Sequence, residues 1–173
     1  IEEITRRAKE AYTYGATEVC VQAGLPPDMD AGLYENICRK IKTEVPDIHI
    51  HGFSPEEILY GATRSNISTK EYLSRLKDAG VDTIPGTAAE ILNQKLRDKI
   101  SPGRITVKDW TDVIKTAHKM GIKSTSTMMF GHLETNEHIV DHLETIREIQ
   151  KETGGFTEFV PLNFIYSEAP MYK

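Results

Sequence analysis

The sequence of 173 residues has two cysteines, one tryptophan and no long uninterrupted hydrophobic run. Because Cys20 and Cys38 are only two and fall in different predicted elements, neither a disulfide framework nor a cysteine metal knuckle is indicated, and we expect free buried thiols. A membrane span needs roughly 18 consecutive apolar residues. The sequence contains no such stretch. It also does not begin with a basic segment followed by an apolar one, as a signal peptide would. We therefore expect a cytoplasmic protein without a membrane partner.

Basic residues are fewer than acidic ones. The chain has 21 Lys and Arg against 26 Asp and Glu, a net charge of −5. Because a nucleic-acid surface needs clustered basic side chains, we expect no nucleic-acid partner. The length suits one domain with a sizeable core, and 39% hydrophobic with 27% charged residues is ordinary for a globular protein.

Amphipathic helical segments alternate with short β-branched runs along the chain. Apolar residues at helical spacing, glycines and capping pairs such as Ser54 with Glu57 and Ser68 with Glu71 mark the helices. We expect residues 87–92 to begin a short helical segment and residues 93–104 to be the most loop-like region. Helices are expected at 1–14, 32–45 and 68–80. Two more are expected to begin at residues 54 and 106, and a last one to end at about residue 152. Strands are expected at 17–21, 48–53, 81–86, within 121–134 and at 156–165.

This alternation predicts parallel βαβ units, because parallel neighbours need a long crossover. The expected fold class is α/β, a partial TIM-like (β/α) barrel of about five parallel strands with outer helices. A doubly wound open sheet is the competing architecture, but the sequence lacks its Gly-x-Gly-x-x-Gly turn. In such folds the chemistry collects at the carboxyl ends of the strands, so the five strand tails should meet around one mouth.

The fourth expected strand is unusually polar. A strand between two amphipathic helices is normally apolar, yet this one carries Ser124, Thr125, Ser126 and Thr127. Alternate residues share a face, so only one hydroxyl pair can line a cavity, and we choose Thr125 and Thr127. The alternative is an ordinary barrel strand whose hydroxyls bind the backbone.

Four motifs in order give a more specific indication. They are His51-Gly-Phe-Ser-Pro-Glu-Glu-Ile58, Ile84-Pro-Gly-Thr-Ala-Ala-Glu-Ile-Leu92, Ser126-Thr-Met-Met-Phe-Gly-His-Leu-Glu134 and Glu158-Phe-Val-Pro-Leu-Asn-Phe-Ile165. Together they resemble the radical S-adenosylmethionine (SAM) enzymes that build the deazaflavin chromophore and futalosine-derived menaquinone. Within that group the chain is most similar to the family of the second subunit of FO synthase, because the menaquinone enzymes tend to have Pro-Gly-Gly-Gly-Ala-Glu in the second motif.

The resemblance implies two cofactors, SAM and a 4Fe-4S cluster. The family holds the cluster with Cys-x-x-x-Cys-x-x-Cys after the first barrel strand, and this motif is missing here. Residues 1–173 are therefore expected to be an internal part of a radical SAM core domain, without the first strand, the cluster loop or a metal ligand. We expect this piece to be inactive alone.

By resemblance, the parent enzyme is a radical SAM transferase that couples the 4-hydroxybenzyl group of L-tyrosine to 5-amino-6-(D-ribitylamino)uracil in deazaflavin (FO) biosynthesis. The implied partners are these two substrates and the first subunit of FO synthase. One alternative is the futalosine-pathway cyclase of menaquinone biosynthesis. Another is a catalytically silent barrel scaffold, which would carry no iron.

The resemblance also implies positions that contact SAM. Gln22 and Gly24 follow the first strand, where backbone carbonyls would meet the ammonium group, although a simple turn is the alternative. Glu90 would bind the ribose hydroxyls, or else be a first-turn glutamate favoured by the helix dipole. Gly131 would pack against adenine, and Glu134 would close the loop unless it is a solvated residue.

Substrate-facing positions are expected on three strands. His51, at a strand end, is the candidate for substrate contact and proton transfer, although a structural histidine is the alternative. Thr125, Thr127 and Asn163 are the other substrate candidates. His49 shares the face of His51, but the sequence places no third metal ligand. His132 is a weaker candidate of the same kind, and the His138–His142 pair is expected on a solvated helix face.

Overall fold

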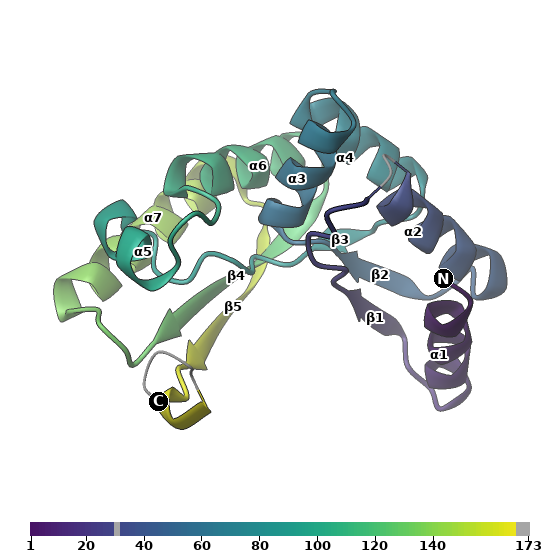
Figure 1. Ribbon diagram of the computed structural model, residues 1–173, viewed down its shortest axis with the longest axis horizontal. Coiled ribbons are helices and arrows are strands. Elements are labelled where there is room, and N and C mark those ends of the chain that lie inside the picture. The colour runs from purple at the N-terminus through teal and green to yellow at the C-terminus, as the bar shows by residue number, and fades with distance from the viewer. Residues whose placement is uncertain (30–31, 169–173) are drawn as a thin grey trace.

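The strands form one sheet in which every neighbouring pair is parallel. The structure, a computed structural model, describes residues 1–29 and 32–168, and within them the strand order is β1-β2-β3-β4-β5, the order of the sequence. The sheet curves into an open arc, with β1 and β5 at its two ends (Figure 1). The strands are β1 (Glu18–Val21), β2 (His49–Gly52), β3 (Thr83–Ile84), β4 (Lys123–Phe130) and β5 (Phe156–Asn163).

The helices lie along the outer side of this arc (Figure 1). This arrangement is a partial TIM-like barrel, as predicted, rather than a doubly wound sheet with helices on both faces. No helix among the described residues is long and apolar enough to cross a membrane. The helices are α1 (Glu2–Thr13), α2 (Leu33–Glu44), α3 (Pro55–Arg64), α4 (Thr69–Asp78), α5 (Gln94–Ile100), α6 (Val107–Lys119) and α7 (Asn136–Thr153), followed by the 3-10 turn Tyr166–Glu168.

One predicted helix is misplaced. Residues 87–92 form turns, and the helix in this region is α5, inside the stretch expected to be a loop. Ala88 and Glu90 have positive φ angles of 62° and 47°, which a right-handed helix does not allow. Asn93 starts α5 instead, because its side chain accepts a hydrogen bond from the amide of Leu96 at 3.1 Å.

The outer face of β4 carries a buried polar contact. Ser124 is fully buried and faces α6, where its hydroxyl lies 2.8 Å from Nε2 of His118. Nδ1 of the same ring lies 2.7 Å from the hydroxyl of Thr153 at the end of α7. Both nitrogens therefore have partners while the imidazole is neutral, and burial lowers the pKa of His118 to about 4.

His142 is buried, which contradicts the predicted solvated face for the His138–His142 pair. Its Nδ1 accepts a hydrogen bond of 3.0 Å from the amide of Leu92, and burial lowers its pKa to about 4. The prediction was wrong because it rested on the charged neighbours of His142 in the sequence. The apolar face of α7 is narrow, and His142 lies on it, packed over the 87–92 turns.

These two histidines predict a loss of stability in mild acid. The unfolded chain takes up protons near pH 6.5, whereas the folded chain holds both rings neutral down to about pH 4. The free energy of unfolding should therefore be constant above pH 6.5 and fall as the pH drops from 6.5 to 4, by up to about 3 kcal/mol per histidine. Urea titrations of the full-length protein across this range measure the fall. His118→Asn should reduce this fall by about half, because His142 remains, and an unchanged fall would contradict the assignment.

Candidate functional site

A polar cavity of about 450 Å³ lies on the inner face of the sheet and takes side chains from all five strands. Gln22, His51, Thr125 and Thr127, four of the residues singled out in the sequence, meet there. The inward choice of Thr125 and Thr127 is thus confirmed, with Ser124 and Ser126 buried on the opposite face. The other strand residues lining the cavity are Glu18, Cys20, His49, Thr83, Thr157, Glu158, Val160 and Leu162, with Pro85 and Thr87 from the turn after β3.

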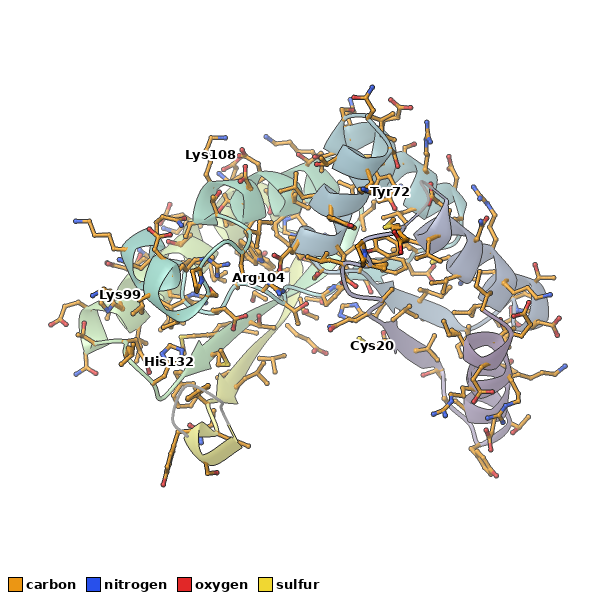
Figure 2. The ribbon with its side chains drawn as sticks, viewed as in Figure 1. Cys20, Tyr72, Lys99, Arg104, Lys108 and His132 are labelled. Atoms are coloured by element: carbon orange, nitrogen blue, oxygen red, sulfur yellow. The ribbon has the colours of Figure 1, made fainter. Side chains whose placement is uncertain are left out.

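One thiol differs from the prediction. Cys38 is free and buried, as expected, but Cys20 is free and exposed on the inner face of β1 (Figure 2). The strand alternates, so Cys20 shares the cavity side with Glu18 and Gln22, and the burial expected for a thiol is absent there.

Thr125 and Thr127 both bind the backbone of Gly86. The hydroxyl of Thr125 accepts a hydrogen bond from the Gly86 amide at 3.0 Å, and the hydroxyl of Thr127 donates one to the Gly86 carbonyl at 2.7 Å. Cavity lining and backbone binding, which the sequence presented as alternatives, therefore occur together. The two threonines hold the tail of β3 against β4.

Gly86→Ala should destabilise this junction. A Cβ atom at residue 86 would lie 2.6 Å from Cα of Ser126, a backbone atom that cannot rotate away. We expect the free energy of unfolding to fall by about 1–3 kcal/mol, the usual cost of overpacking. Urea denaturation of the full-length protein measures it. Gly52→Ala is the matched control, because its Cβ would meet Ile50 Cγ2 at 3.2 Å and should cost less. Equal losses would contradict the argument.

The loop after β1 is held by Glu57 at the start of α3. One carboxylate oxygen accepts hydrogen bonds from the amides of Ala23 at 2.6 Å and Gly24 at 2.8 Å. The other accepts from the amide of Ser54 at 2.8 Å and from its hydroxyl at 2.7 Å. The hydroxyl of Tyr34 donates to the Gly24 carbonyl, and Gly24 has a positive φ of 69°. Glu57, predicted only as a capping residue, thus also fixes the loop of Gln22 and Gly24.

The turn that carries Glu90 is held by a buried arginine. Nη1 of Arg97 in α5 donates a hydrogen bond to the carbonyl of Ala89 at 2.6 Å, and Nη2 donates one to the carbonyl of Ile105 at 2.7 Å. The Glu90 carbonyl accepts a hydrogen bond of 3.0 Å from the amide of Met129, which connects this turn to β4. Among the described residues, the Glu90 carboxylate has no hydrogen-bond partner, which suits a hydroxyl-bearing ligand.

A second group of predicted residues gathers where β4 and β5 end. Glu134 accepts hydrogen bonds from the amides of Gly131 and His132, and its Oε2 lies 2.9 Å from Nδ1 of His132. The backbone hydrogen bonds contribute to a lowered pKa for Glu134, against the opposing effect of burial. A Cβ on Gly131 would lie 3.0 Å from Oδ1 of Asn163. Glu134 thus holds the turn, and none of these residues is among those that line the cavity.

Several residues of this architecture were not predicted from the sequence. Glu18 and Thr83 line the cavity, while Glu57 and Arg97 hold the turns around it. Strand alternation would have placed Glu18 beside Cys20 and Gln22 on the inner face. Nothing local in the sequence distinguishes Arg97 from a solvated lysine or arginine.

The described residues do not form a metal site. No group of three or more His, Cys, Asp or Glu side chains in residues 1–29 and 32–168 could hold an ion. Cys20 lies on β1 and Cys38 in α2, so these thiols do not supply the three thiolates of an iron–sulfur cluster.

A parallel (β/α) half-barrel with a polar inner cavity defines the chain as a TIM-barrel-like α/β protein. The model of the radical SAM superfamily matches residues 1–146, and the chain belongs to that superfamily. It is 48% identical over 99% of its length to the 5-amino-6-(D-ribitylamino)uracil--L-tyrosine 4-hydroxyphenyl transferase of Methanothermobacter thermautotrophicus. It is 47% identical, again over 99% of its length, to the FO synthase of Mycobacterium leprae.

The chain spans 47% of the length of the first of these relatives and 20% of the second. Among solved structures, it matches the cobalamin-dependent SAM radical enzyme OxsB with a TM-score of 0.53 and 12% identity, over 92% of this chain and 23% of that one. GMP reductase from Trypanosoma brucei matches with a TM-score of 0.50 and 17% identity, over 91% and 31%. At these identities the matches establish the fold alone.

Proposed function

We propose that the protein containing this chain is a radical SAM transferase of deazaflavin (FO) biosynthesis. It couples the 4-hydroxybenzyl group of L-tyrosine to 5-amino-6-(D-ribitylamino)uracil, with SAM and a 4Fe-4S cluster as cofactors. The observation that carries the proposal is the 48% identity over 99% of the chain to a transferase named for these two compounds. A first FO synthase subunit is the proposed protein partner, because the relatives include chains named FO synthase.

In this proposal the cavity side chains hold the substrates. His51, Thr125 and Thr127 border one space and offer hydrogen-bonding groups to a phenol or a uracil edge. Asn163, at the end of β5, contributes a donor and an acceptor near the mouth. Neutral groups of this kind orient reactants and exclude water while a cofactor supplies the difficult chemistry.

SAM would lie across the strand tails. The Gln22–Gly24 loop is already fixed by Glu57, so its carbonyls, including the second lone pair of the Gly24 carbonyl, would meet the ammonium group, and Glu90 offers an unpaired carboxylate to ribose hydroxyls. The Gly131 turn, held by Glu134, offers a backbone surface without a side chain to a purine ring. When bound, the cofactor supplies a radical that abstracts hydrogen. The cluster ligands belong to other parts of the protein.

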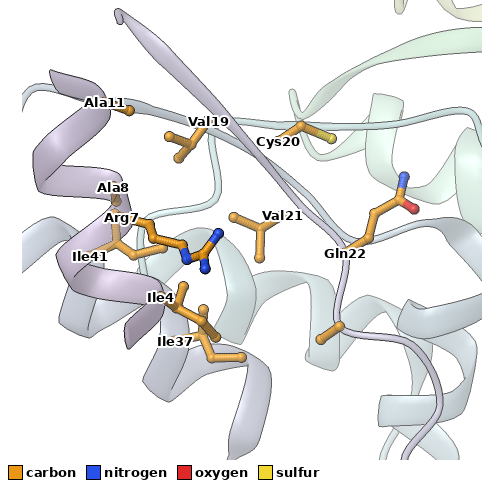
Figure 3. A pocket seen from close by; sticks show the side chains of 11 residues that line it. Ile4, Arg7, Ala8, Ala11, Val19, Cys20, Val21, Gln22, Ile37 and Ile41 are labelled. Carbon is orange, nitrogen blue, oxygen red and sulfur yellow. The ribbon is translucent and has the colours of Figure 1, made fainter. Parts of the chain in front are cut away.

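We also propose that this chain is one part of a larger radical SAM core domain. β1 is an edge of the sheet, and an apolar groove of about 380 Å³ runs beside it, bordered by Ile4 and Ala8 of α1 and Ile37 of α2 (Figure 3). An unpaired edge beside apolar side chains suits a further parallel strand. The greater length of the relatives agrees with this.

Product analysis tests the proposed function. The full-length protein, reconstituted with iron and sulfide under anaerobic conditions, is given SAM with tyrosine and the diaminouracil, or SAM with a futalosine-derived substrate. Mass spectrometry should find the coupled tyrosine–uracil adduct only in the first mixture. Product only in the second mixture would favour the futalosine-pathway cyclase. A protein that binds no iron and forms neither product would favour a silent scaffold.

A further inference from the structure

One hydroxyl lies between two histidines on the inner face of the sheet. Oγ1 of Thr83 in β3 is 2.7 Å from Nε2 of His49 and 2.7 Å from Nδ1 of His51, both in β2. Glu18 of β1 is paired in register with His49, and its Oε2 lies 3.5 Å from the same Nε2. All four side chains border the polar cavity. They form a continuous polar chain across three neighbouring strands.

The number of protons limits how this chain can be arranged. A threonine hydroxyl has one hydrogen, so it donates to one imidazole and accepts from the other. A carboxylate only accepts, so Glu18 favours a hydrogen on Nε2 of His49. That N–H donates to Oγ1 of Thr83 at 2.7 Å, with the Glu18 carboxylate 3.5 Å from the same nitrogen, and the Thr83 hydrogen is left for Nδ1 of His51. A neutral His51 that accepts at Nδ1 must carry its hydrogen on Nε2.

We infer that Glu18 and Thr83 are positioning residues that hold His51 in the Nε2–H tautomer, so that His51 presents a hydrogen-bond donor to the cavity. Among the described residues Nε2 of His51 has no protein partner, which leaves this donor for a ligand. The carboxylate of Glu18 thus sets the tautomer of His51 without touching it. Its influence passes through the ring of His49 and the hydroxyl of Thr83.

The charges around His51 agree with a neutral ring. Burial is the largest influence and lowers the pKa of His51, and the neighbouring His49 lowers it further. Glu18 and Glu158, from the two edge strands, raise it, but burial prevails. A neutral ring has two possible tautomers, and the hydrogen bonds described above choose between them.

This arrangement restricts what can bind at His51. An N–H donor pairs with an acceptor oxygen, such as a carbonyl, a carboxylate or a phenolate, and not with a ligand N–H. This part of the inference rests on the proposed function, in which a uracil carbonyl or the tyrosine oxygen would be the acceptor. The tautomer itself does not depend on that function.

Histidine NMR tests the tautomer directly. The full-length protein, labelled with ¹⁵N in its histidine rings, is recorded at neutral pH without SAM or iron, and His51 is assigned with a His51→Gln variant. Long-range ¹H–¹⁵N correlations distinguish a ring protonated at Nε2 from one protonated at Nδ1. We expect the Nε2–H pattern for His51 in the wild type. The Nδ1–H pattern would overturn the inference.

Variants test the relay. Thr83→Val removes the bridging hydroxyl and should give His51 a mixture of tautomers, whereas Thr83→Ser, which keeps the hydroxyl, should restore the Nε2–H pattern. Glu18→Gln, whose amide can donate to His49, should raise the Nδ1–H share of His51 several-fold. An unchanged His51 pattern in both Thr83→Val and Glu18→Gln would overturn the relay. Because no reaction is required, this result and a failure of the proposed activity remain distinguishable.

Discussion

Glu57→Ala is expected to lower the free energy of unfolding by about 3–5 kcal/mol and the SAM-dependent activity of the full-length protein by at least about tenfold. The buried carboxylate accepts four hydrogen bonds, two from the loop after β1 and two from Ser54. A hydrogen bond to a charged group contributes roughly 1.5–3 kcal/mol, and donors left unpaired in a buried site add their desolvation cost. The loop of Gln22 and Gly24 would also lose its fixed position. Urea denaturation and turnover assays measure the two effects.

Glu71→Ala is the matched control. Glu71 occupies the same position in the second Ser-x-x-Glu helix start, but its exposed carboxylate pairs with Arg75 of its own helix at 2.9 Å. Losing such a surface pair should cost less than about 1 kcal/mol and leave activity unchanged. Similar losses in the two variants would show that Glu57 acts only as a helix cap.

Arg97→Met should have a comparable effect through a different part of the site. Arg97 is 2% exposed, and its guanidinium donates to the carbonyls of Ala89 and Ile105, which methionine cannot do. We expect a loss of about 3–5 kcal/mol from two buried carbonyls left without a charged donor. Because the same contacts shape the turn of Glu90, the affinity for SAM should fall at least about tenfold. Calorimetric titration with SAM measures the affinity.

Arg75→Met provides the comparison for Arg97. Its side chain is 45% exposed and contacts only the surface carboxylate of Glu71 among the ion pairs of the described residues. Its removal should change the free energy of unfolding by less than about 0.5 kcal/mol. If Arg97→Met unfolds at the same urea concentration as this variant and binds SAM normally, Arg97 does not support the site.

The sequence was most informative where a pattern has a local physical cause. Helical spacing and Ser54 with Glu57 located α3, and alternation along β4 placed Thr125 and Thr127 on one face. Periodicity does not say which face of a strand turns inward, so that choice needed the curvature of the whole sheet. Only half of the polar run on β4 lines the cavity, because Ser124 and Ser126 are buried on the outer face, where Ser124 contacts His118 and Ser126 donates to the carbonyl of Glu158.

The remaining features depend on contacts between distant segments. The turns at 87–92 require Arg97 and Met129, and the buried position of His142 depends on those same turns. The bridge from Glu18 to His51 joins three strands far apart in the sequence. No local propensity encodes such pairings, and a glutamate on a short strand looks like any solvated residue until the register is known.

Formation of 5′-deoxyadenosine tests the central claim most directly. The reconstituted full-length protein is incubated anaerobically with SAM and a reductant, with and without L-tyrosine, and the nucleoside is quantified by chromatography. We predict that tyrosine raises its formation at least about tenfold, and that Glu57→Ala abolishes this increase while Glu71→Ala retains it. Formation that is independent of tyrosine, or none at all in a protein carrying a full cluster, would contradict the assignment of this chain to a tyrosine-dependent radical SAM transferase.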